Sequence, residues 1–212
     1  MQFQRSFAGL ILALFVSVTT THAAVDIIKS LNIKGGFVVH LGCGDGKLTL
    51  ALRPNSRFLV HGLDANLANV AKARAAVKAA GVYGPVSIDR LAGNSLPYIG
   101  NMVNLLVAED LKGVPKAEVM RVLAPKGIAY IKSGGEWKAT TKPRPKNIDD
   151  WTHYLHDAGG NAVAHDTVVG PPRHLQWLGS PRWSRHHDRM ASMSALVSAG
   201  GRVIYVMDEG SR

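Results

Sequence analysis

From residue 25 to residue 132, short apolar runs alternate with stretches in which apolar residues lie three or four positions apart. The short runs are typical of buried strands and the longer spacing is typical of helices. The pattern predicts strands at 38–41, 57–63, 85–91, 102–108 and 127–132, and helices at 47–52, 66–80 and 115–123. Strands that alternate with helices in this way indicate an α/β fold, in which crossover helices connect a mostly parallel sheet of about five strands.

The turn after the first predicted strand has three glycines, in the stretch VVHLGCGDGK from residue 38 to residue 47. Glycines let a backbone turn sharply or approach a ligand closely. In an α/β sheet, ligands bind beyond the carboxyl ends of the strands, so the turn lies where a ligand is expected. A dinucleotide fingerprint would need its third glycine at position 47, which is Lys47. The glycines could also serve only to make a tight turn.

The G-x-G-x-G spacing of residues 42–46 resembles motif I of the class I S-adenosylmethionine-dependent methyltransferases. The resemblance continues in chain order through FLVHGLDANLANVAKAR, LAGNSLPY and EVMRVLAPKGIAYIK, and it covers roughly residues 25–132. It implies a Rossmann-like domain, with bounds that we place at 25–135. It also implies S-adenosylmethionine as a cofactor whose methyl group is transferred to an acceptor. The acceptor is not identified by the sequence.

The same resemblance implies a set of cofactor-binding positions and no general base. These positions are Gly42, Cys43, Gly44, Gly46, Asp64, Ala65, Asn94, Ser95 and Glu109. Asp64 is expected to bind the ribose hydroxyls, because a carboxylate can accept two hydrogen bonds from a diol. Alternatively, Asp64 could only cap the helix 66–80. His40 stands where the family usually has an acidic residue, and Cys43 is interpreted as a packed residue rather than a nucleophile.

The regular alternation stops after Lys132. Residues 136–150 are predicted to be a basic, proline-containing linker, because Lys142-Pro143-Arg144-Pro145 favours an extended chain. In the segment 151–212, the stretch SALVSAGGRVIYVMDEG predicts a β-hairpin that turns at 199–201. This segment resembles the opening part of secreted β-propeller proteins with PQQ-binding-like repeats. The resemblance implies a truncated propeller with one blade hairpin, whose partners would be the missing blades or another protein surface.

Histidines gather in the second half of the chain. His153, His156, Asp157, His165 and Asp166 lie close together in sequence, and His186, His187 and Asp188 follow further on. Two histidines three positions apart on a helical turn could share a metal ion. The spacing fits no closed zinc signature, however, and no cysteine contributes. Hydrogen-bonded histidines without a metal are therefore the expectation.

The N-terminus and the composition bear on location and partners. Residues 1–23 combine an early Arg5, an apolar stretch and a small-residue cleavage site, which predicts a secretory signal peptide and an exported chain without a lasting membrane span. With one cysteine, Cys43, the chain has no internal disulfide. The formal net charge of +10 favours acidic partners, but no nucleic-acid motif is present.

Two functions follow from these patterns. The first is an S-adenosylmethionine-dependent methyltransferase with an unknown acceptor, in an exported propeller-type protein. The second is a catalytically degenerate Rossmann-like domain that serves as a scaffold or interaction module for the propeller. The glycine turn and Asp64 favour the first. His40, and the lack of a visible counterpart to the last two strands of the methyltransferase family, favour the second.

Overall fold

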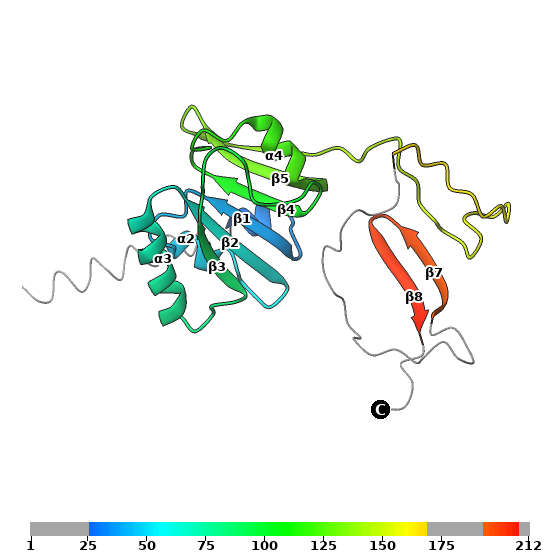
Figure 1. Ribbon diagram of the computed structural model, residues 1–212, viewed down its shortest axis with the longest axis horizontal. Coiled ribbons are helices and arrows are strands. Elements are labelled where there is room, and N and C mark those ends of the chain that lie inside the picture. The colour runs from blue at the N-terminus through cyan, green and yellow to red at the C-terminus, as the bar shows by residue number, and fades with distance from the viewer. Residues whose placement is uncertain (1–25, 169–192, 208–212) are drawn as a thin grey trace, which may run out of the picture. The chain divides into compact units, whose positions relative to one another are not determined.

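The computed structural model describes residues 26–168 and 193–207, and the chain divides into two compact units, one up to Arg144 and one from Pro145 onward (Figure 1). The predicted signal peptide and the segment with His186, His187 and Asp188 lie outside the described residues. In the described part of the chain, no helix is long and apolar enough to cross a membrane.

The first unit is built around a six-stranded sheet with the order β3-β2-β1-β4-β5-β6 (Figure 1). All neighbours in this sheet are parallel except β5 and β6, which are antiparallel. The strands are β1 (Gly36–Leu41), β2 (Phe58–Asp64), β3 (Val86–Arg90), β4 (Val103–Ala108), β5 (Leu123–Ser133) and β6 (Glu136–Thr141). The α/β fold with a mostly parallel sheet is therefore confirmed, and the strand order reverses between β1 and β4.

Both faces of the sheet are covered at its centre, which explains why β1 and β4 are nearly continuous apolar runs. Alternate residues of a strand point to opposite faces, so Val38 and Val39 of β1 belong to two different core clusters. The first cluster includes Val70, Ala73 and Val77 of α3 (Leu67–Ala79). The second includes Val119 and Val122 of α4 (Lys116–Val122).

Local signals fix where the helices begin and end. The side chain of Asn66 caps α3 by accepting a hydrogen bond from the Ala68 amide at 2.9 Å. At the other end, Gly81 adopts a left-handed conformation with φ +68°, directly after the C-cap residue Ala80. The short helix α2 (Lys47–Ala51) begins at Gly46, which is also left-handed, with φ +82°.

Strand β6 lies where the sequence predicted the start of a linker, so the prediction of a linker over 136–150 is wrong for residues 136–141. The strand pairs with β5 along its whole length, and Trp137 stacks on Tyr130 with ring centroids 4.8 Å apart. Between the strands, Gly134 and Gly135 both have positive φ, as a tight hairpin turn of this type requires. The sheet therefore has one more strand than the five predicted.

The second unit contains the predicted hairpin as a separate two-stranded sheet, with β7 (Met193–Ala199) antiparallel to β8 (Arg202–Met207). The turn is at Gly200-Gly201, as predicted. Val203, Ile204 and Val206 are largely exposed. Residues 153–156 form a tight turn closed by an antiparallel bridge instead of the helical turn that was considered for His153 and His156.

Candidate cofactor site at the carboxyl edge of the sheet

The glycine turn is held against the neighbouring strand by backbone hydrogen bonds. The amides of Gly42 and Cys43 both donate to the carbonyl oxygen of Leu63, at 2.7 and 3.1 Å. Leu63 belongs to β2, which pairs in parallel with β1, so both strands end at the same edge of the sheet. This edge is where α/β proteins bind their ligands.

The side chain of Asp64, the last residue of β2, also stabilises this turn through hydrogen bonds. Its Oδ2 accepts hydrogen bonds from the Gly44 amide at 2.9 Å and from Asn69 Nδ2 at 3.2 Å, and its Oδ1 accepts one from the Asn66 amide at 2.9 Å. Burial alone would raise the pKa of Asp64, but these hydrogen bonds outweigh it and hold the pKa below its usual value. The carboxylate is therefore ionised at neutral pH. Since Asn66 caps α3, the alternative that Asp64 is only a helix cap is wrong.

Gly44 and Gly46 are needed for different reasons. Gly46 has φ +82°, and a Cβ placed on it would lie 2.9 Å from the Cβ of Ala73, so glycine lets α2 approach α3 closely. Gly44 also has a positive φ, +55°, but a Cβ there would meet no atom within 4 Å. The open space beside Gly44, next to an ionised carboxylate, is what a ligand that lies against the turn requires.

His40 is buried in β1 and its side chain faces α2. Its Nδ1 lies 2.7 Å from the hydroxyl oxygen of Thr49, which is also buried. Burial lowers the pKa of His40 to about 4 against the opposing effect of the Asp64 carboxylate, so the ring is neutral at pH 7. His40 therefore orients the first turn of α2 and carries no charge for a cationic ligand.

Cys43 lies in the turn but is buried, with 3% of its surface exposed. Burial, together with the nearby Asp64 carboxylate, raises the pKa of its thiol to about 11. A thiol that stays protonated at neutral pH is a poor nucleophile. Cys43 therefore contributes to the site through its packing and through its backbone amide, which donates to Leu63.

The remaining predicted positions differ in their exposure and in their hydrogen-bond partners. Ala65 and Asn94 are exposed in loops that follow β2 and β3. Ser95 follows Asn94, but its hydroxyl donates to Glu118 Oε1 of α4 at 3.1 Å. Glu118 also accepts from the Leu96 amide and pairs with Arg121, so Ser95 has a structural partner within the unit.

Glu109 follows β4 and lines a groove of about 580 Å³. The groove lies between the end of β4, helix α4 and the strands β5 and β6. Its lining includes apolar and basic side chains, among them Leu111, Met120, Ile131, Lys132 and Lys138. Neither the glycine turn nor Asp64 lines this groove. Glu109 follows Ala108, which pairs with Leu41, the residue before Gly42, so Glu109 leaves the sheet at the same edge as the glycine turn while it lines this groove.

Two residues that contact this site, Asn69 and Lys112, were not predicted from the sequence. Asn69, one turn into α3, donates to Asp64, and Lys112 lies over the turn, with its Cε 3.4 Å from where a Gly42 Cβ would stand. The charge of Lys112 also contributes to the lowered pKa of Asp64. Lys112 could have been found only from the strand order, because β4 is the neighbour of β1 in space but follows two further strands in the chain.

Comparison with known proteins gives one family match. Residues 38–127 match the family model Methyltransf_25, described as a methyltransferase domain. The match begins in β1, includes the glycine turn and Asp64, and ends within β5, so it lies entirely in the first unit and covers less than half of the chain. No curated protein matches the chain.

Several solved structures resemble the chain over part of its length. One is a candidate S-adenosyl-L-methionine-dependent methyltransferase from Methanococcus maripaludis, with 23% identity over 53% of this chain and 54% of that chain and a TM-score of 0.48. The YcgJ protein from Bacillus subtilis has 24% identity over 52% and 49%, with a TM-score of 0.45. A candidate sarcosine dimethylglycine methyltransferase from Galdieria sulphuraria has 16% identity over 54% and 46%, with a TM-score of 0.48.

The chain therefore spans about half the length of the solved structures that it matches. Residues 38–127, which contain the glycine turn and Asp64, are therefore similar to a methyltransferase domain.

Proposed function

We propose that the first unit binds S-adenosylmethionine at the carboxyl edge of β1 and β2 and transfers its methyl group to a nucleophilic acceptor. The observation that carries this proposal is the hydrogen bond from the Gly44 amide to Asp64, which sets an ionised carboxylate beside open space at the turn. The cofactor would supply an activated methyl group. The protein would supply positioning, which is the main source of acceleration when two reactants are held in line.

The donors and acceptors at this edge fit the cofactor. Asp64 accepts three hydrogen bonds within the protein, and a carboxylate has about four acceptor sites. A ribose diol that donates twice would therefore use the remaining site and replace Asn69, whose contact is the longest of the three at 3.2 Å. Lys112, the cation above the turn, would suit the carboxylate of the methionine part.

The acceptor would enter beside Glu109, through the groove between α4 and β6. Apolar side chains such as Met120 and Ile131 are combined there with Lys116, Lys132 and Lys138. The three lysines outnumber the carboxylates of Glu109 and Asp110 in the same lining, which suits an acceptor that is partly apolar and carries negative charge.

Calorimetry with S-adenosylmethionine and with its demethylated product tests the proposal on the full-length chain. We expect binding that Asp64→Ala weakens by about tenfold or more, because a hydrogen bond to a charged acceptor contributes roughly 1.5–3 kcal/mol. Asp89→Ala is the matched control, since Asp89 is the penultimate residue of the neighbouring strand β3 and pairs with Arg74 instead of the turn. Thermal melting shows whether each variant remains folded. Absence of binding at millimolar cofactor would contradict the proposal.

The second candidate is a scaffold that has lost the activity of its fold family. His40 favours it, because a neutral ring bonded to Thr49 stands where the family usually has a carboxylate. The same calorimetry distinguishes the two candidates, since a scaffold gives no binding with either ligand.

Export and the propeller are further parts of the proposal. We infer that residues 1–23 direct the chain out of the cytoplasm and that residues 151–212 belong to a propeller-type assembly. The apolar side chains exposed on both faces of β8 support the second part, because a hairpin of this kind fits between other strands. N-terminal sequencing of the chain after expression in its own host tests the cleavage after Ala23, and the gene sequence beyond Arg212 tests for blades.

A further inference from the structure

Residues 147–167 of the second unit form a loop whose two ends meet. The Thr167 amide donates to the carbonyl oxygen of Asn147 at 3.2 Å, and the Asp149 amide donates to Asp166 Oδ1 at 2.6 Å. The loop therefore brings Asp149 beside His165, although 16 positions separate them in sequence.

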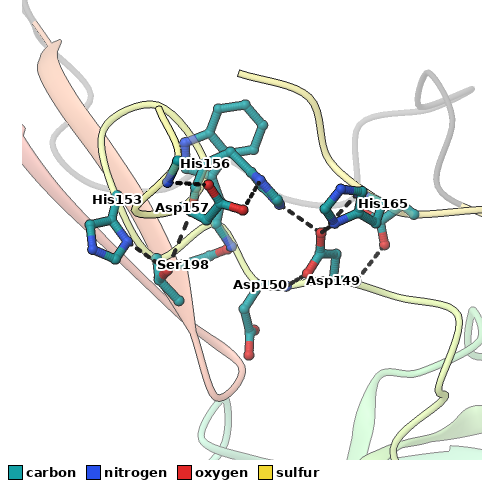
Figure 2. A network of polar contacts seen from close by, with 11 residues as sticks. Asp149, Asp150, His153, His156, Asp157, His165 and Ser198 are labelled. Carbon is teal, nitrogen blue, oxygen red and sulfur yellow. Dashed lines mark hydrogen bonds and ion pairs between the residues drawn. The ribbon is translucent and has the colours of Figure 1, made fainter. Parts of the chain in front are cut away.

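Three potential metal ligands converge where the loop closes (Figure 2). Asp149 Oδ2 lies 2.7 Å from His156 Nε2 and 3.5 Å from His165 Nδ1, and one ligand atom from each of the three residues lies within 4.8 Å of the others. The two imidazole rings meet edge to face, with centroids 5.0 Å apart. No other group of three such residues was found among the described residues.

The surroundings of the three residues differ in a way that suits a site with one open side. His156 is buried, with 3% of its surface exposed, and the Trp151 ring packs against it edge-on at 5.2 Å. Its second nitrogen, Nδ1, lies 3.5 Å from Asp157 Oδ2, and metal-binding histidines commonly have such a carboxylate behind them. The side chain of His165 is 75% exposed, so solvent reaches the third ligand.

The donor set decides which ions could bind. Two imidazoles and a carboxylate suit zinc and its transition-metal neighbours and do not suit magnesium or calcium, which prefer oxygen. Ligand atoms around a tetrahedral zinc lie roughly 3.3 Å apart, since each is about 2.0–2.1 Å from the ion. The separation between Asp149 and His165 already has this size. His156 Nε2 would give up the hydrogen bond that it shares with Asp149 at 2.7 Å and move back by roughly 0.6 Å.

We propose that Asp149, His156 and His165 bind one divalent transition-metal ion of the zinc type, with the remaining coordination positions open to solvent. This site lies in the second unit and is independent of the proposed methyl transfer.

The ion would fix the loop to the hairpin. Trp151, which packs on His156, exchanges two hydrogen bonds with Ser198 of β7: the Ser198 amide donates to its carbonyl oxygen at 2.6 Å, and its own amide donates to Ser198 Oγ at 3.1 Å. An ion bound between Asp149 and His165 would hold the loop closed. Trp151, which makes both hydrogen bonds to Ser198, is part of this loop. The expected consequence is slower hydrogen exchange at Trp151 and Ser198 when zinc is bound.

Zinc titration of the metal-free, full-length chain tests the proposal, with His165→Ala and His153→Ala as a matched pair. His153 lies in the same loop, but its Nδ1 contacts the Thr152 hydroxyl at 2.9 Å and it is not one of the three ligands. We expect one zinc ion per chain from this site, an affinity that falls by more than about tenfold in His165→Ala, and no change in His153→Ala. Millimolar magnesium should not compete.

All other histidines stay in place in both variants, so weak binding elsewhere in the chain is the same in each. Because His165 is exposed, its replacement should leave the fold intact, and circular dichroism checks this. Cobalt provides a second measurement, since four- or five-coordinate cobalt absorbs strongly in the visible range. Equal zinc affinity in the two variants, or wild-type chain without this cobalt absorption, would overturn the proposal.

Discussion

Among single residues, Gly46 is important for the stability of the turn, whereas Gly44 is important for cofactor binding. Both have positive φ, so any side chain costs about 1 kcal/mol or more of backbone strain. Only Gly46 also packs directly against α3, where a Cβ would lie within 3.0 Å of Ala73 atoms. Stability and cofactor binding should therefore respond differently to the same substitution at these two positions.

We expect Gly46→Ala to lower the free energy of unfolding of the first unit by about 2–4 kcal/mol, because strain and overpacking add. Gly44→Ala should lower it by only about 1 kcal/mol but weaken S-adenosylmethionine binding, since the new methyl group would occupy the open space beside the turn. Urea unfolding and calorimetry of both variants check this. Equal effects of the two substitutions on cofactor binding would contradict the division of roles.

His40 makes stability depend on pH. Its pKa is about 4 in the folded chain and 6.5 when exposed, so between these values the unfolded chain binds a proton that the folded chain does not. The free energy of unfolding should therefore rise with pH from about 4 to about 6.5 and stay constant above, with a change of roughly 3 kcal/mol at most from this residue. His40→Asn removes the titrating group and keeps a polar partner for Thr49. Urea titrations at about pH 5 and about pH 7 should show a smaller difference for the variant than for the wild type.

At the scale of elements, β6 completes the first unit by covering the edge of β5. Its contribution is concentrated in the stacked pair of Trp137 and Tyr130, because the other side chains of the strand are exposed. We expect Trp137→Ala to lower the free energy of unfolding by about 1–3 kcal/mol, less than for a fully buried tryptophan. Lys138→Ala, an exposed neighbour on the same strand, should change it by less than about 0.5 kcal/mol. A Trp137→Ala variant as stable as wild type would show that β6 is dispensable.

The elements were predictable from sequence where apolar periodicity was strong. The five parallel strands and the helices α2, α3 and α4 lie within a few residues of their predicted positions. Strand β6 was missed because its alternation of polar residues with Trp137 and Ala139 is weak and one-sided. The signal was nevertheless present, since Gly134-Gly135 is the same turn that correctly predicted the hairpin at Gly200-Gly201.

The candidate sites were predictable to the extent that they depend on chain order. Gly44 and Asp64 meet because neighbouring parallel strands end at one edge, and that follows from the alternation of strand and helix. Lys112 and the link between Ser95 and Glu118 depend on strand order and packing, which a single sequence does not contain. The convergence of Asp149, His156 and His165 depends on the closure of an irregular loop without any periodicity, so only hydrogen-bonded histidines were expected from the sequence.

For the whole molecule, the division after Arg144 predicts two units that unfold separately. We expect a chain that ends at Arg144 to keep the melting temperature and the cofactor affinity of the first unit, because β1 to β6 and both core clusters lie before that residue. In the full chain, amides of β8 should exchange hydrogen faster than those of Val38–Leu41, since its side chains are exposed and its sheet has only two strands. Unfolding of the shortened chain would show that the first unit depends on the second.

Lys142 gives the boundary between the units a mechanical property. Its ammonium group donates to Asn101 Oδ1, and to the carbonyl oxygens of Arg121 and Leu123, and its backbone pairs with Lys126 and Gly127. A pulling force applied through the second unit would therefore meet this anchor first and then peel β6 from β5 one pair at a time, starting at Thr141. The glycine turn follows β1, which β4 and β5 separate from β6, so tension on an attached partner would leave the cofactor edge undistorted until β6 had detached from the sheet.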